Sequence, residues 1–194
     1  MPSRAKPESR LRAYVALLRA VNLGSRNKVS MPDLRSVFVA VGGEDVETYV
    51  QSGNVVFRSR AAEPGKLTNA IEKRLRSELD LDVSVLLRTQ AELASVVAAN
   101  PFAARQRDPT KLHVTFLRDA VDKARGRKLE ARQLEPDEFR ILGRQVYLHC
   151  PEGYGRSKLS NAYFEKELGV AATTRNWRTV TKLAELADAA QPSG

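Results

Sequence analysis

The sequence has very few of the residues on which metal sites and disulfides depend. It contains one cysteine, Cys150, and two histidines, His113 and His149. A single cysteine excludes an internal disulfide framework and any metal knuckle built from cysteine pairs, and it fits a reducing compartment. Because neither histidine has a second His or Cys at ligand spacing, the sequence predicts no metal site and no cofactor. We expect each histidine to be a strand residue with a satisfied hydrogen bond.

Long apolar runs are missing as well. The apolar segments at residues 13–18 and 83–87 are far shorter than the roughly 20 residues that a bilayer span needs, and none forms a signal peptide. The sequence therefore predicts a cytoplasmic protein without a membrane partner. It also lacks the Gly-x-Ser-x-Gly motif of many hydrolases, and no pair of carboxylates stands in an apolar setting. No motif in the sequence indicates a particular reaction.

Basic residues exceed acidic ones, at 32 against 23, which gives a formal net charge of +9. Arginine forms forked hydrogen bonds with phosphate, so this excess fits a polyanionic partner. A general preference of the genome for Arg and Ala explains the composition equally well. The hydrophobic fraction of 42% is ordinary for a globular chain that buries a core.

The first part of the chain predicts a ferredoxin-like unit. An apolar run typical of a central strand is followed by a helix that Ser30 and Asp33 cap, by a hairpin turning at Ser52-Gly53, by a helix opening at Pro64, and by a strand. This β-α-β-β-α-β order places two helices on one face of a four-stranded antiparallel sheet. The expected elements span residues 13–21, 31–41, 45–51, 54–59, 64–79 and 83–88.

The rest of the chain predicts the same order again. A capping box of Thr89 and Glu92 starts a connecting helix, and the last elements are a helix over about 158–168, a short extended piece and a final helix from Trp177. We find a repeat of element order only, with no repeat of individual residues. The predicted class is α+β, with two ferredoxin-like subdomains, antiparallel sheets and a C-terminal helix. Its parts are a disordered tail (1–11), the first subdomain (12–88), a connecting helix and loop (89–110) and the second subdomain with the C-terminal helix (111–194).

Four segments that we expect to be loops concentrate Arg, Lys, Asn, Gln and Gly: residues 19–28, 51–54, 154–158 and 173–177. Glycines allow close backbone approach, and cations ahead of a helix N-terminus favour an anion there. In the third segment we expect Ser157 to cap the following helix. The serine precedes the lysine, so this is not a Walker loop. The candidate binding residues are Arg19, Asn22, Arg26, Asn27, Lys28, Gln51, Asn54, Tyr154, Arg156, Ser157, Lys158, Arg175 and Asn176.

These segments leave several functions open. The first hypothesis is binding of a phosphate-bearing ligand, either a nucleotide or a nucleic acid, although base stacking is disfavoured because the matching strand offers only Phe57. The second is an enzyme acting on a phosphorylated or other anionic small molecule, with Lys158 or His149 as proton shuttle. The third is a structural role at the subdomain or subunit interface, with Arg175 and Asn176 buried and hydrogen-bonded, and burial of the guanidinium groups against carbonyls or acids would favour it. Convergence of the four segments on one cleft would favour ligand binding, whereas scattering would favour simple capping.

The sequence resembles a widespread, mostly bacterial family catalogued as domain of unknown function 1697. The matching stretches are residues 16–35, 49–57, 100–102, 112–117 and 154–183, in family order and over most of the chain. The resemblance implies an α+β protein of two units similar to ferredoxin-like domains, and it brings no established activity, substrate or cofactor. Packing alone seldom requires Arg-Asn or Gly-Arg-Ser-Lys, so the resemblance favours a ligand contact at one or more of these segments.

This sequence departs from the family pattern in its first polar segment. Ala20 and Ser25 stand where glycine is usual, and Ser30 stands where proline is frequent. These residues restrict the backbone of that segment more than glycine would.

Overall fold

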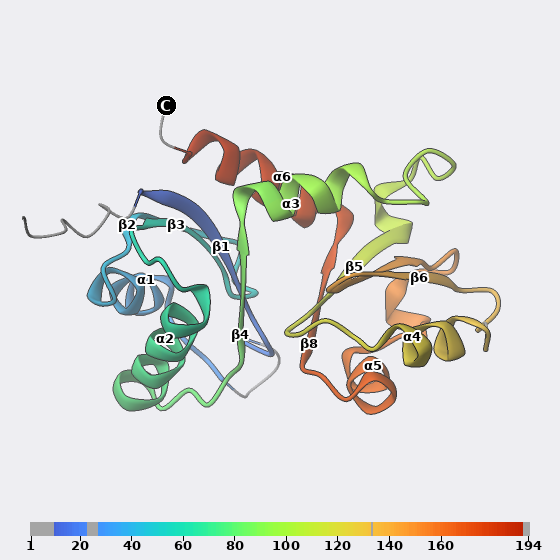
Figure 1. The fold of residues 1–194 in the computed structure, drawn as a ribbon, viewed down its shortest axis with the longest axis horizontal. Coiled ribbons are helices and arrows are strands. Elements are labelled where there is room, and N and C mark those ends of the chain that lie inside the picture. The colour runs from blue at the N-terminus through green and yellow to red at the C-terminus, as the bar shows by residue number, and fades with distance from the viewer. Residues whose placement is uncertain (1–9, 23–26, 133, 192–194) are drawn as a thin grey trace, which may run out of the picture.

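In the computed structural model, which describes residues 10–22, 27–132 and 134–191, the chain forms two halves that stand side by side (Figure 1). Each half holds one four-stranded antiparallel sheet, and the strand orders are β2-β3-β1-β4 and β6-β7-β5-β8. The expected ferredoxin-like element order is confirmed in both. The first half consists of β1 (Arg12–Leu18), α1 (Met31–Ala40), β2 (Glu44–Tyr49), β3 (Asn54–Ser59), α2 (Pro64–Leu79) and β4 (Val85–Thr89).

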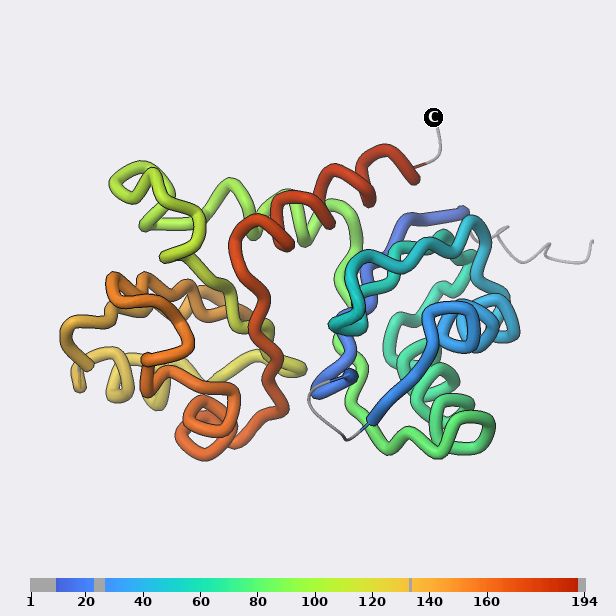
Figure 2. The backbone as a smooth tube through the Cα atoms, turned by 180° about the vertical axis from the view of Figure 1, so that it is seen from behind, coloured from blue at the N-terminus to red at the C-terminus, as the bar shows by residue number. Residues whose placement is uncertain are grey.

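A helix follows the last strand of each half. These two helices, α3 (Gln90–Ala98) and α6 (Trp177–Ala189), pack against each other and lie across both halves (Figure 2). The second half consists of η1 (Pro109–Lys111), β5 (Leu112–Leu117), α4 (Lys123–Glu130), β6 (Glu138–Leu142), β7 (Gln145–His149), η2 (Tyr154–Arg156), α5 (Asn161–Leu168) and β8 (Ala172–Asn176). Among the described residues, no helix combines the length and apolar character that crossing a bilayer requires.

Two expected boundaries near the C-terminus were wrong. Residues 173–177 are not a loop, because β8 pairs with β5 from Ala172 to Asn176 and α6 begins at the next residue. The helix α5 begins at Asn161, where the Ser160 hydroxyl accepts the N–H of Tyr163, so Ser157 is not its cap. Two adjacent β-branched residues in β8, Thr173 and Thr174, favour the extended conformation found there.

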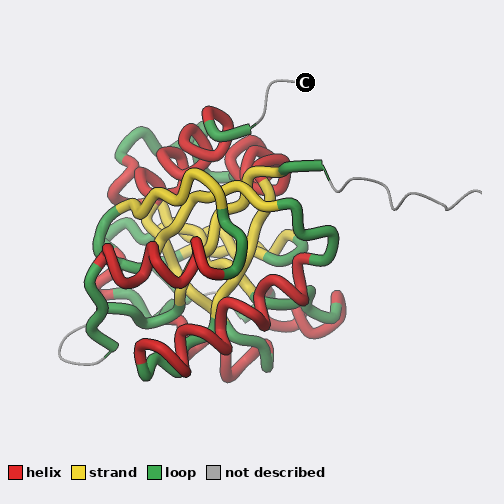
Figure 3. The backbone as a smooth tube through the Cα atoms, turned by 90° about the vertical axis from the view of Figure 1, so that its left-hand side faces the viewer, coloured by secondary structure: helices red, strands yellow, loops and turns green. Residues whose placement is uncertain are grey.

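Three apolar clusters hold the molecule together. In the outer clusters, α1 and α2 cover one face of the first sheet (Figure 3), and α4 and α5 cover one face of the second. The central cluster lies between the opposite faces of the sheets and beneath α3 and α6. Because side chains alternate along a strand, Val15 and Leu17 of β1 enter the central cluster while Tyr14, Ala16 and Leu18 enter the outer one.

The two halves hold each other through equivalent ion pairs. Arg19, which follows β1, pairs through Nε and a terminal nitrogen with Glu165 of α5, at 2.5 and 2.7 Å. Arg118, which follows β5, pairs through its two terminal nitrogens with the two carboxylate oxygens of Glu72 in α2, at 2.9 and 3.3 Å. Each pair joins one half to the other. Reciprocal contacts of this kind relate the halves by an approximate twofold axis.

Candidate anion-binding cavity between the halves

Arg175 crosses from β8 of the second half into the first half. It is 7% exposed, and among the described residues no carboxylate pairs with it. Burial lowers the pKa of its guanidinium to about 10, so the group remains cationic at neutral pH. Six hydrogen bonds hold it: Nε to Asn54 Oδ1 (2.5 Å), one terminal nitrogen to the carbonyls of Leu18 (2.8 Å), Ser52 (3.0 Å) and Gly53 (3.5 Å), and the other to Thr173 Oγ1 (2.7 Å) and the Thr174 carbonyl (3.0 Å).

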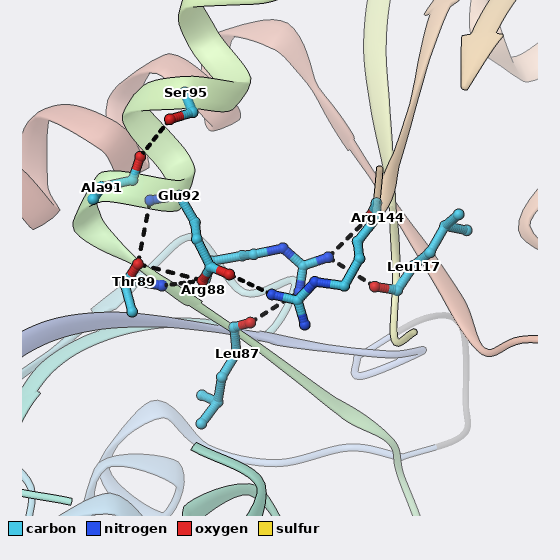
Figure 4. A network of polar contacts seen from close by, with 8 residues as sticks. All are labelled: Leu87, Arg88, Thr89, Ala91, Glu92, Ser95, Leu117 and Arg144. Atoms are coloured by element: carbon cyan, nitrogen blue, oxygen red, sulfur yellow. Dashed lines mark hydrogen bonds and ion pairs between the residues drawn. The ribbon is translucent and has the colours of Figure 1, made fainter. Parts of the chain in front are cut away.

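Arg88 on β4 is the counterpart of Arg175. It is 2% exposed and donates to carbonyls of Leu87 (2.8 Å), Leu117 (2.7 Å) and Arg144 (3.0 Å), the last two in the second half. Burial and the nearby Arg144 charge lower the pKa of Arg88 to about 10, and the Glu92 carboxylate opposes that shift. Figure 4 shows Arg88 beside the ion pair that Glu92 forms with Arg144. Unlike Arg175, Arg88 therefore has a carboxylate nearby.

A cavity of about 300 Å³ lies beside Arg175, and all four polar segments predicted from the sequence reach it. The first contributes Ala20, the second Ser52, the third Tyr154, and the fourth Arg175 and Asn176. No Asp or Glu lines it within the described part of the chain. The lining residues are Ala20, Val21, Ser52, His113, Tyr154, Asn161, Thr173, Thr174, Arg175, Asn176 and Thr179. The segments converge on one site, as the ligand-binding hypothesis requires.

Several hydrogen-bond acceptors in the lining are already engaged. Oγ1 of Thr173 and the carbonyls of Ser52 and Thr174 accept from Arg175. Oδ1 of Asn161 accepts from the Thr174 hydroxyl at 2.7 Å, and Oδ1 of Asn176 accepts from the backbone N–H of Thr179 at 2.8 Å.

Donors in the lining are not engaged to the same extent. Across the described residues, no hydrogen bond is made by Nδ2 of Asn161, by Nδ2 of Asn176 or by the Thr179 hydroxyl. A group that offers acceptor oxygens and no hydrogen fits such a lining, and a deprotonated phosphate or carboxylate is such a group.

His113 lies on the same cavity and contradicts the expectation of a satisfied strand histidine. It is 8% exposed, and its buried Nδ1 has no hydrogen-bond partner among the described residues. The ring stacks on Tyr154 with the centroids 4.6 Å apart. Burial lowers the pKa of His113 to about 4, so the imidazole is neutral at neutral pH. A buried unpartnered polar group carries a free-energy cost, which a ligand that bonds to it removes.

The candidate residues of the first half mainly shape the loops around the cavity. Asn22 donates to the carbonyls of Val29 (3.1 Å) and Gln51 (2.9 Å), and Asn27 donates to the carbonyl of Ala20 (3.0 Å). Lys28 and Gln51 are exposed and line a neighbouring cavity of about 400 Å³ with Asn22, Val29 and Ser30. Asn54 is buried against Arg175, Arg19 is paired with Glu165, and Arg26 lies outside the described residues.

Backbone strain accumulates in these loops. Ala20, Asn22, Asn27 and Val50 all have positive φ, between 49° and 56°. This conformation is unfavourable for residues with a Cβ, above all for a β-branched one, and strained residues of this kind cluster at binding sites.

In the second half, Tyr154 lines the cavity while Arg156 and Lys158 are exposed next to it in sequence. The Ser157 hydroxyl accepts the N–H of Leu159 at 3.0 Å. Asn176 caps α6 and is exposed, so of the two residues expected to be buried at an interface only Arg175 is buried. In the described part of the chain, neither Arg156 nor Lys158 forms an ion pair. These two cations are therefore available to attract an anion toward the cavity.

The structure separates His149 from Lys158, which the enzyme hypothesis brought together. His149 contacts Gln106 and Glu138, each at 3.0 Å, and its ring lies 6.0 Å from that of Phe102 in the central cluster. Tyr154 and Leu159, which flank Lys158 in sequence, belong to the outer cluster on the other face of the sheet. In the described part of the chain, no cleft shared by His149 and Lys158 supports a proton relay between them.

Sequence analysis missed His113, Asn161 and Thr179 as cavity residues, and it missed Arg88. One signal was present in the sequence. Both Arg88-Thr89 and Arg175-Asn176 place an arginine directly before a helix cap at the end of a strand. This pair is a residue-level repeat, so the finding of a repeat in element order alone was incomplete.

Comparisons with known proteins agree with this architecture. The family model described as "Protein of unknown function (DUF1697)" matches residues 11–147. A solved structure of a conserved bacterial protein from Streptococcus pneumoniae is similar, with a TM-score of 0.73 and 22% identity over 92% of this chain and 99% of that chain. At this identity the similarity shows a shared fold alone. No curated protein matches the chain significantly.

Proposed function

Since the chain belongs to the DUF1697 family, whose description assigns no activity, we propose from the cavity's own chemistry that the protein binds a small phosphate-bearing molecule between its halves. The observation that carries the proposal is the buried positive charge of Arg175, which has no carboxylate partner among the described residues. Charges act more strongly in a buried site than in water, so an anion in the adjoining cavity is stabilised by this guanidinium.

The form of the site favours a small ligand over a nucleic acid. Its volume of about 300 Å³ is at the low end for small-molecule sites. A nucleic-acid surface instead needs several exposed cations spaced to contact successive phosphates. Arg156 and Lys158 are exposed and follow the cavity residue Tyr154 in sequence, and we assign them to attraction of the anion rather than to direct contact with it. We place this binding in the cytoplasm.

Isothermal titration calorimetry at low salt tests the proposal, with inorganic phosphate and adenosine monophosphate as separate ligands. We expect one site per chain and a melting temperature that rises with ligand concentration, because a ligand at a hundredfold excess over Kd stabilises by about 2.7 kcal/mol. The double variant Arg156→Ala/Lys158→Ala should bind several-fold more weakly at low salt and like the wild type at high salt, because salt screens exposed charges.

Fluorescence anisotropy with labelled single-stranded and double-stranded DNA and RNA tests the alternative. Tight nucleic-acid binding that the double variant abolishes, with no heat from either small ligand, would replace the small-molecule proposal. Absence of any heat or thermal shift with the two small ligands would overturn it.

A further inference from the structure

The approximate twofold axis places two cavities in equivalent positions, one beside each buried arginine. The cavity beside Arg88 has a volume of about 400 Å³ and receives Thr89 and Glu92 from the start of α3. The cavity beside Arg175 receives Asn176 and Thr179 from the start of α6. Thr89 and Asn176 are the helix caps, and Glu92 and Thr179 each lie three residues after their cap. Glu92 and Thr179 are therefore equivalent positions with different chemistry.

In the first of these cavities, a side chain of the protein already supplies an anion. One carboxylate oxygen of Glu92 accepts the backbone N–H of Thr89 at 2.8 Å and its hydroxyl at 3.3 Å, and the other oxygen pairs with Arg144 (Figure 4). The carboxylate thus satisfies the helix cap and faces the Arg88 charge at once.

In the second cavity, no described side chain supplies such an anion. Thr179 is too short to reach back to the N–H of Asn176, and it is 7% exposed at the cavity wall. Strand register pairs Asn176 with His113 as it pairs Thr89 with Tyr14, so the Asn176 N–H has the same orientation as that of Thr89. His113, whose buried Nδ1 has no hydrogen-bond partner among the described residues, lies opposite Asn176 in this register and lines the same cavity.

We propose that the phosphate group of the ligand occupies, at the first turn of α6, the position that the Glu92 carboxylate occupies at the first turn of α3. It accepts from the N–H of Asn176, from the Thr179 hydroxyl and from the ring of His113, and it faces Arg175. Thr179 is then the residue that leaves room for an external anion. This inference rests on the proposed function and adds the location of the phosphate and the residue that selects for it.

The variant Thr179→Glu gives the second cavity the side chain found in the first. We expect its affinity for inorganic phosphate to fall at least tenfold, because the new carboxylate takes the position of the phosphate. Thr179→Gln fills similar space without charge, so its melting temperature should lie a few degrees below that of Thr179→Glu, which gains the attraction of Arg175. Thr179→Val keeps the room and removes the hydroxyl, and we expect it to bind several-fold more weakly.

The reverse variant, Glu92→Thr, does not depend on how position 179 tolerates a new side chain. It removes the anion of the first cavity and leaves Arg88 and Arg144 without it, so we expect calorimetry with inorganic phosphate to change from one site per chain to two. Wild-type affinity in Thr179→Glu, or a single site in Glu92→Thr, would overturn the inference while the proposed function stands. A wild type that binds no phosphate would overturn both.

Discussion

The two halves of this protein are joined by equivalent buried arginines and differ in whether a carboxylate lies near the arginine charge. Each half sends a buried arginine, Arg88 or Arg175, into the other half and caps a long helix directly after it. Beside Arg88 the chain provides its own carboxylate, that of Glu92, whereas Thr179 stands at the equivalent place beside Arg175. The joining contact at Arg88 and the proposed binding site at Arg175 therefore differ by one carboxylate of the protein.

Removing the two arginines gives the largest expected effect. Arg175→Met leaves three buried carbonyls without their donor, and we expect the free energy of unfolding to fall by about 3–5 kcal/mol, because unsatisfied buried groups cost about 1–3 kcal/mol each. Arg88→Met should cost less, about 2–4 kcal/mol, since Arg88 makes fewer hydrogen bonds. Urea denaturation measures both, with the exposed Arg35→Met as control.

The same pair of variants separates joining from binding. Arg175→Met should lose phosphate binding, and Arg88→Met should keep it wherever the folded state is still populated. Equal loss of binding in both variants would contradict the distinction drawn between the halves.

The second prediction concerns His113, whose counterpart in the first half is Tyr14. The pKa of His113 is about 4 when folded and 6.5 in its ordinary state, so between these values the unfolded chain binds a proton that the folded chain does not. Stability therefore falls as the pH drops from 6.5 to 4, by about 3 kcal/mol from this residue. Denaturation curves at several pH values should show this slope, and His113→Gln should flatten it. An unchanged slope in the variant would show that other groups cause it.

The smallest effect tests how closely the halves correspond. Glu72 and Glu165 each pair with an arginine of the other half and each accept the N–H that opens the next strand, from Val85 at 2.8 Å and from Ala172 at 2.9 Å. We expect Glu72→Ala and Glu165→Ala to lower stability by about 1.5–3 kcal/mol each and to agree within about 0.5 kcal/mol. The exposed Glu78→Ala is the control and should cost about 0.3–0.5 kcal/mol. If the two variants differed twofold in their loss of unfolding free energy, the two halves would correspond in backbone fold only.

Local signals allowed the elements to be predicted from sequence. The cap at Ser30 and the capping box of Thr89 and Glu92 were confirmed because such motifs act within one turn of chain. The helix α5 begins later than expected because either Ser157 or Ser160 could cap it. Contacts outside this segment determine which serine is the cap.

The site could be predicted only in part. Polar composition identified four segments that do meet at the cavity, yet arginine in a sequence is expected at the surface, and nothing local marks Arg88 or Arg175 as buried. Their burial follows from how the halves pair, which involves residues more than a hundred positions away in the case of Leu18 and Arg175. The correspondence between charged residues of the two halves was missed because the second half has fewer residues between them. No fixed sequence spacing therefore relates the two sets.

The position of α6 determines the order in which parts of the chain can fold. Val180, Leu183 and Ala187 of this helix complete the central cluster, and Gln191 accepts the N–H of Ala13 at 3.0 Å, so a segment that follows the second half packs on β1. The outer clusters involve residues close in sequence and can form during synthesis. The apolar face between the sheets stays exposed until α6 has been synthesised. The joining of the halves and the formation of the cavity therefore follow the synthesis of α6.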